Sequence, residues 1–187
     1  MTGAQGKITP LAQLLEWVAL QHGGQLIRRT TEPYFKHLIA VADLAKNRVP
    51  LGYEIGLCHD LLEDTATDEK QLLASLRSFG YADSDAFQIT SAVVELTDVF
   101  TAAAYPELTK KERKNFEAER LLTISAAAQT VKYSDLIYNI GWVLKYDSKD
   151  AKRYLKKKRL LVEGMIKGDP ALRQKALSAI ESGLRDL

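Results

Sequence analysis

The chain has 187 residues, of which 46% are hydrophobic and 27% are charged, a composition typical of globular proteins that excludes a disordered or a fibrous chain. This length fits one domain. Because 26 basic side chains face 24 acidic ones, the formal charge is only +2, and the total gives no strong field for a polyanion such as nucleic acid.

The use of cysteine and the apolar runs indicate the compartment. Cys58 is the single cysteine, which excludes an intrachain disulfide and points to a reducing environment. No apolar run reaches the roughly 18 residues that a membrane span needs. The first ten residues, MTGAQGKITP, lack the apolar segment of a secretory signal. We therefore expect a cytoplasmic protein that neither spans nor binds a membrane.

Apolar residues recur at the helical spacing of three or four along nearly the whole chain, and residues typical of helix ends separate the segments. In chain order, helices are predicted from Pro10 to the Gly23-Gly24 pair, from Pro33 through Ala45, over 51–62, between Asp68 and Gly80, over 85–96, after Thr109, over 126–146, after Ser148, and from Asp169-Pro170 to Leu187. Within 85–96, Phe87 is expected to be buried together with Ile89, Ala92, Val93 and Leu96. The stretch 97–108 has no clear period and is expected to be a loop.

No segment alternates with the period of a strand, and no repeat or low-complexity linker divides the chain. We therefore predict an all-α protein of about nine helices. It would form one compact domain over 1–187, with its core at about 9–166 and an added C-terminal helix over 169–187.

The clearest chemical signal is the segment HDLLED at residues 59–64. His59 and Glu63 are four residues apart, as are Asp60 and Asp64, so on a helix each pair would lie along one side. Four polar or ionisable groups would thus lie at one end of a helix that is otherwise apolar, and burying them without a partner costs free energy. A bound cation would remove this conflict.

His37 and Asp135 extend this set, because each lies on a predicted helix among apolar neighbours. Two imidazoles and two carboxylates form a mixed site that suits Mn²⁺, Fe²⁺ or Zn²⁺ better than Ca²⁺, and the lack of thiolates argues against structural zinc. Structural interpretations stay open. Glu63 and Asp64 can be a solvated helix end, and Asp135 with Asn139 can be a polar pair at a helix interface.

The order of these residues resembles the H…HD…D signature of the HD phosphohydrolase superfamily. The resemblance covers about residues 12–166, most of the chain, and three segments narrow it to the hydrolase domain of RelA/SpoT homologues. They are HGGQ with RR and EPYFKH (His22–Gln25, Arg28–Arg29 and Glu32–His37), HDLLEDT (His59–Thr65), and VKYSDLIYN (Val131–Asn139).

That family has an all-helical fold, and with one manganese ion it removes the 3′-pyrophosphate of (p)ppGpp, the alarmone of the stringent response. The resemblance therefore implies a nucleotide-binding hydrolase with one divalent metal ion, Mn²⁺. It implies that the metal is held by His37, His59, Asp60 and Asp135, and that Glu63 and Asp64 position and activate the water. It also implies contacts to the nucleotide: Arg28 faces the purine, and Arg29 lies near the phosphates. Asn139 contacts the ribose side, and Tyr154 helps to hold the nucleotide.

The sequence also departs from the family pattern. Thr30-Thr31 replaces the usual Ser-Gly after the arginines, and Leu136 and Tyr138 replace the Arg and His of the long enzymes. Tyr138 before Asn139 is instead similar to the small alarmone hydrolases of the metazoan SpoT-homologue type. These departures leave the metal and water residues intact and leave the choice of purine base open.

Two other functions remain open beside hydrolysis of (p)ppGpp to GDP or GTP and pyrophosphate. The same chemistry could act on another nucleotide, such as ppApp or the 2′-phosphate of NADPH, or the domain could be a catalytically silent nucleotide sensor. Basic runs at 110–114 and 152–159 are explained either as solvated faces or as attraction for an anionic nucleotide. They are not interleaved with aromatic residues, so no nucleic-acid partner is expected. The oligomeric state stays open, a homo-oligomer included.

Overall fold

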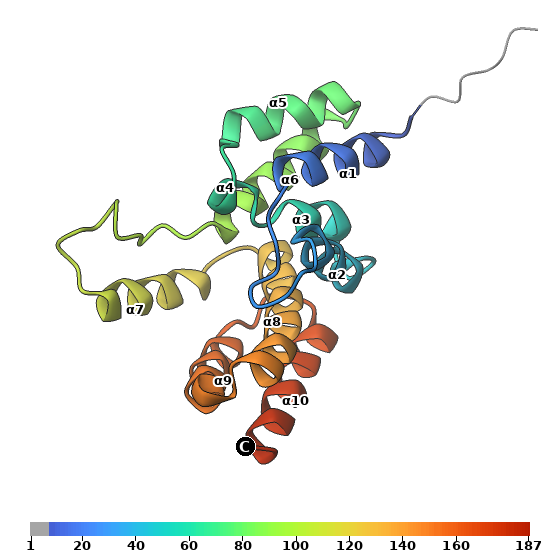
Figure 1. Ribbon diagram of the computed structural model, residues 1–187. Helices are drawn as coiled ribbons and strands as arrows, with labels where there is room; N and C mark the ends of the chain where they lie inside the picture. The colour runs from blue at the N-terminus through green and yellow to red at the C-terminus, as the bar shows by residue number, and fades with distance from the viewer. Residues whose placement is uncertain (1–7) are drawn as a thin grey trace, which may run out of the picture.

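The computed structural model describes residues 8–187, and this part of the chain forms ten helices (Figure 1). They are α1 (Pro10–Gln21), α2 (Phe35–Ala45), α3 (Gly52–Cys58), α4 (Leu61–Asp64), α5 (Glu69–Phe79), α6 (Asp83–Leu96), α7 (Lys110–Leu121), α8 (Ala126–Tyr146), α9 (Ser148–Gly164) and α10 (Pro170–Arg185). Among these residues the only β pairing is one isolated bridge between Leu26 and Pro33. The prediction of an all-α fold is confirmed.

Side chains predicted to cap helices do so in the structure. The hydroxyl of Thr9 accepts from the N–H of Ala12 at 3.2 Å, and Pro10 follows as the first residue of α1. Thr109 and Glu112 form a capping box at the start of α7. Each of these contacts satisfies an N–H group that the first turn of a helix leaves free, which explains why these starts could be read from the sequence.

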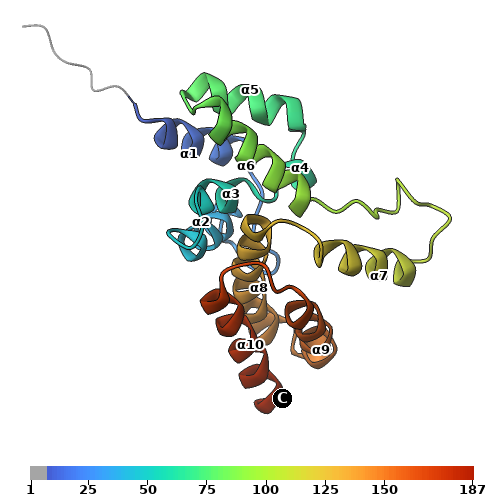
Figure 2. The ribbon, with the colours of Figure 1, turned by 180° about the vertical axis from the view of Figure 1, so that it is seen from behind.

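The long helix α8 lies in the middle of the molecule and organises the core. Both views show α1, α5 and α6 grouped near one end of α8, and α9 and α10 beside its other end (Figures 1 and 2). Helices α2 and α3 pack on each other and on α8. A side chain at Gly56 would place its Cβ only 2.8 Å from the Cα of Ala42, so glycine is what permits α2 and α3 to approach so closely. This trio of helices positions the site described below.

The third predicted helix, 51–62, is not continuous: it is divided into α3 and α4, which accounts for ten helices where about nine were predicted. Helix α3 ends at Cys58, α4 begins at Leu61, and Asp60 between them has φ −103° and ψ 2°. In an unbroken helix the carbonyl of Gly56 would accept from the N–H of Asp60. Here it accepts instead from the Nδ1 of His59, at 2.8 Å. The break therefore frees Asp60 to turn its carboxylate toward the histidines.

Two smaller expectations are also wrong. The second helix begins at Phe35 rather than at Pro33, because Pro33 pairs with Leu26 in the isolated bridge. Phe87 is 65% exposed rather than buried. Helix α6 buries Ala86, Ile89, Val93 and Leu96, and this spacing of three and four leaves the next position, 87, on the outer side.

The loop predicted at 97–108 joins α6 to α7, and together they form an arm that stands out from the other helices (Figures 1 and 2). A buried carboxylate holds the two parts of the arm together: Glu117 on α7 accepts from the backbone N–H groups of Val99 and Phe100 in the loop, at 3.0 and 3.1 Å. Arg120 donates to the carbonyl of Glu95 at 2.8 Å. In the described part of the chain, no helix is both long and apolar enough to cross a membrane.

Candidate metal centre

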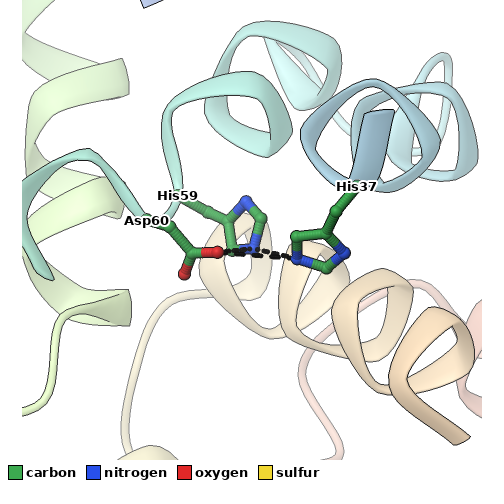
Figure 3. Close-up of side chains that lie close together, drawn as sticks. All are labelled: His37, His59 and Asp60. Atoms are coloured by element: carbon green, nitrogen blue, oxygen red, sulfur yellow. Dashed lines mark hydrogen bonds and ion pairs between the residues drawn. The ribbon is translucent and has the colours of Figure 1, made fainter. Parts of the chain in front are cut away.

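His37 on α2 and His59 at the end of α3 direct their rings toward the same point (Figure 3). Their Nε2 atoms are 3.3 Å apart, and both residues are only 3% exposed. The Nδ1 of His59 donates to the carbonyl of Gly56, which orients the ring so that its Nε2 faces the centre. Nε2 is thus the ring nitrogen that a metal ion would displace a proton from.

Two carboxylates complete the group. An oxygen of Asp60 lies 3.0 Å from the Nε2 of His59 and 3.5 Å from that of His37. An oxygen of Asp135, on α8, lies 3.9 and 3.6 Å from the same two atoms. The four residues predicted as ligands are thus brought together from α2, the α3–α4 junction and α8.

The pKa values follow from this crowding. Burial disfavours the imidazolium form of His59, but the charges of Asp60 and Asp135 outweigh it and raise the pKa of His59 to about 9. Burial also disfavours the charge of Asp60, yet the neighbouring His59 and hydrogen bonds from His37, His59 and Tyr34 hold the pKa of its carboxyl well below the usual range. The group thus strongly favours a positive charge at its centre.

A divalent metal ion fits this arrangement. Ligands bonded to an ion at about 2.1 Å lie roughly 3.0–3.4 Å apart when they are neighbours in a tetrahedral or octahedral set. The Nε2 to Nε2 and Nε2 to Asp60 distances, 3.0–3.5 Å, agree with that spacing. His37, His59 and Asp60 form the group whose ligand atoms are all close to one another, and the Asp135 oxygen, 3.6 and 3.9 Å from the two Nε2 atoms, lies somewhat farther out. Imidazole and carboxylate together form a donor set for a transition metal rather than for calcium.

Two residues that hold the carboxylates were quoted in the motifs but given no role. Lys132 lies one turn before Asp135 on α8, and its Nζ is 3.1 Å from the second oxygen of that carboxylate. The hydroxyl of Tyr34 donates to Asp60 at 2.6 Å. The i,i+3 spacing could have identified Lys132. No local spacing connects Tyr34 with Asp60, which are 26 residues apart.

Glu63 and Asp64 lie on α4, outside the group of four, and their carboxylates are exposed at its edge. Glu63 accepts a hydrogen bond from the backbone N–H of Asp98, at the start of the arm. Desolvation by its neighbours raises the pKa of Glu63 to about 7, and this prevails over the lowering effects of that hydrogen bond and of Lys132. Desolvation and the charge of Asp60 also raise the pKa of Asp64. The carboxylate of Glu63 is therefore able to exchange a proton near neutral pH.

A pocket of about 190 Å³ opens beside His37. It is lined by Ile27, Arg28, Tyr34, His37, Tyr138, Asn139 and Trp142. The guanidinium of Arg28 lies 5.9 Å from the ring centre of Trp142, and the indole N–H donates to the carbonyl of Arg28 at 2.9 Å. Asn139 donates to the carboxylate of Asp135 and so joins the pocket to the metal centre.

The two adjacent arginines have different surroundings. Both lie on the loop between α1 and α2, as predicted, but only Arg28 lines the pocket. Arg29 adopts a positive φ of 62° and pairs with Asp147 at 3.3 Å, just beyond the end of α8. It also donates to the carbonyl of Tyr146. These contacts make Arg29 an anchor for the loop at the negative end of the α8 dipole.

Tyr154 and His22 lie on opposite sides of the centre. Tyr154, on α9, is half-buried and does not line the pocket; burial and the charge of Asp135 raise the pKa of its hydroxyl. His22 is 3% exposed, stacks on Tyr34 at 5.6 Å, and bonds through Nδ1 to the side chain of Gln25 at 2.8 Å. His22 is thus a packing residue beside the site.

No protein-family model matches the chain, and no curated protein matches it in sequence. A solved structure does match. It belongs to a metazoan ortholog of SpoT, described as hydrolysing ppGpp and as playing a role in starvation responses. The TM-score is 0.73 and the identity 22%, over 98% of this chain and 99% of that chain. The chain thus has the all-helical fold of a SpoT-type hydrolase, which confirms the resemblance in fold.

Proposed function

We propose that the protein is a metal-dependent phosphohydrolase that converts (p)ppGpp into GDP or GTP and pyrophosphate. The observation that carries the proposal is the convergence of His37, His59, Asp60 and Asp135 beside a pocket lined by Arg28 and Trp142. The fold shared with a ppGpp hydrolase supports this substrate class.

The four converging residues would hold one divalent ion, and we propose Mn²⁺. When bound, such an ion stabilises the charge that develops on a phosphate and lowers the pKa of a water. Lys132 and Tyr34 keep the two carboxylates turned toward the histidines through the contacts described above.

Glu63 and Asp64 would handle the protons. The oxygen of the attacking water forms a bond to the phosphorus attached to the ribose 3′-oxygen, and the bond between that phosphorus and the 3′-oxygen breaks. One proton of the water passes to a carboxylate and then to the 3′-oxygen; the other stays on the released pyrophosphate. The pKa of Glu63, raised to about 7, suits such an exchange near neutral pH, and the pKa of Asp64 is shifted in the same direction.

The pocket would hold the nucleoside. The planar guanidinium of Arg28 and the indole of Trp142 can both stack on a purine, and Asn139 lies between them and the metal centre, where it can contact the ribose. Tyr154 would approach the phosphates from the α9 side.

The experiment is to incubate metal-loaded protein with ppGpp, pppGpp, ppApp, NADPH and cyclic dinucleotides, and to separate the products by ion exchange. We expect release of pyrophosphate from ppGpp and pppGpp, and no release by the Asp60→Ala variant. Turnover of only ppApp or NADPH would move the assignment to another nucleotide. Turnover of none would leave the nucleotide sensor as the better interpretation.

A further inference from the structure

The functional side chains of α8 follow one another along a single face of that helix. Lys132, Asp135, Asn139 and Trp142 are spaced by three, four and three residues, which is the repeat of one helix face. Trp142 lines the pocket, Asp135 belongs to the metal centre, and Lys132 lies one turn beyond it. A nucleotide that lies along this face, with its base in the pocket, therefore has its phosphates directed toward Lys132.

Lys158, on α9, is a second cation, close enough to Lys132 and Asp135 for their charges to act on it. Its Nζ lies 5.5 Å from the ring centre of Tyr154, one turn earlier on the same helix. The side chain is only partly exposed, unlike most of the basic run 152–159. Within residues 8–187, Lys158 forms no ion pair. The carboxylate of Asp135 pairs with Lys132.

The charges around Lys158 favour the binding of an anion. Lys132 and Lys114 act on it as like charges, and Asp135 and Asp98 as opposite ones; burial and Lys132 together lower the pKa of Lys158 to about 8. A cation that is largely removed from water beside a second cation is unfavourable unless an anion binds there.

We propose that Lys158, together with Lys132, binds the outer phosphate of the 3′-diphosphate, which leaves as part of pyrophosphate. This inference rests on the proposed function and adds to it a preference for 3′-diphosphates over 3′-monophosphates. When the phosphorus next to the ribose is at the metal centre, the outer phosphate lies farther from Asn139 and reaches the Lys132 end. A monophosphate has no group to place there.

The test compares Lys158→Met with Lys156→Met, an exposed lysine on the same helix. We measure kcat/KM on ppGpp and on the analogue with a single 3′-phosphate. Loss of a hydrogen bond between charged groups costs about 10–100-fold. We expect that loss for Lys158→Met on ppGpp alone, recovery in Lys158→Arg, and no change in Lys156→Met. Equal losses on both substrates, or no loss, would overturn the subsite.

A second measurement does not need turnover. Binding of inorganic pyrophosphate and of orthophosphate to the metal-loaded protein is followed by calorimetry. We expect the Kd of pyrophosphate to rise about tenfold in Lys158→Met, while that of orthophosphate stays the same. If the parent protein hydrolyses no nucleotide but shows this pattern, the proposed function fails and the subsite stands. If it hydrolyses ppGpp and the variant binds pyrophosphate unchanged, only the subsite fails.

Discussion

The two ends of the site along α8 differ in the chemistry that they offer. At the Trp142 end the pocket is aromatic, and Arg28 is the charged side chain in its wall beyond the metal centre. At the Lys132 end, lysines lie close to carboxylates, and the pKa values of Lys132, Glu63 and Lys158 depart from their usual ranges. In the proposed function, one helix would thus separate recognition of the base from the chemistry on the phosphates.

The two ends are also fixed by different parts of the chain. The α1–α2 loop is tied to the end of α8 through Arg29 and Asp147. The charged end is tied to the arm instead, through the hydrogen bond between Glu63 and the backbone of Asp98. Substitutions at the two ends should therefore have different kinetic effects. Those at the pocket end should change substrate binding, and those at the charged end should change the rate of the chemical step.

The largest effect is expected where the two ends meet. Asp60→Ala and Asp135→Ala each remove a carboxylate from the group of four, so both variants should lose the metal ion and with it activity at both ends. The loss should exceed the ~10²–10³-fold that removing one electrostatic contact costs. Metal analysis with circular dichroism measures this, and Asp43→Asn, an exposed site on α2, is the control. Full metal content in both variants would refute the ligand assignment.

The convergence of His37, His59, Asp60 and Asp135 could be predicted from the sequence because their signal is local or belongs to a motif. His59-Asp60 is a dipeptide, and Asp135 and Asn139 share a helix face. The break between α3 and α4 could not be predicted, because it depends on a side chain that competes with the backbone for the carbonyl of Gly56. Apolar spacing alone favours a continuous helix there.

The next effect concerns the charged end alone. Glu63→Gln and Asp64→Asn should keep the metal and the substrate affinity but lower kcat by about 10²–10⁴-fold, the usual contribution of a general base. Glu16→Gln, an exposed site on α1, should leave kcat unchanged. Parental turnover in both variants would mean that the proton is taken up elsewhere.

The pH dependence of the rate tests the same end of the site. Glu63 accepts a proton only when it is ionised, and its pKa is raised to about 7. The rate should therefore fall on the acid side of about pH 7, approaching tenfold for each further pH unit, and level off above it. In Glu63→Gln this acid limb should disappear from the residual rate. A limb that persists unchanged in the variant would assign it to another group.

Contacts between distant segments explain what the sequence could not show at the two ends. Arg28 and Arg29 are neighbours of the same type, and nothing local distinguishes them. Both guanidinium groups lie near the ring of Trp142, but Arg29 pairs with Asp147, more than 100 residues away, whereas Arg28 lines the pocket and its carbonyl accepts from the indole N–H. Lys158 likewise differs from the rest of its basic run only through Tyr154 and the charges on α8.

The smallest effect is expected at the pocket end, and the two arginines allow it to be isolated. Arg28→Ala removes a guanidinium that lines the pocket, so KM should rise by about 2–30-fold, the range of one cation–π contact, while kcat and metal content stay the same. Arg29→Ala removes an anchor to Asp147 instead, so it should lower Tm by a few degrees at most, because a surface ion pair contributes about 0–1 kcal/mol. Steady-state kinetics and thermal unfolding of both variants distinguish the two roles. An unchanged KM in Arg28→Ala would show that the base is held elsewhere, and a rise in KM in Arg29→Ala alone would exchange the two assignments.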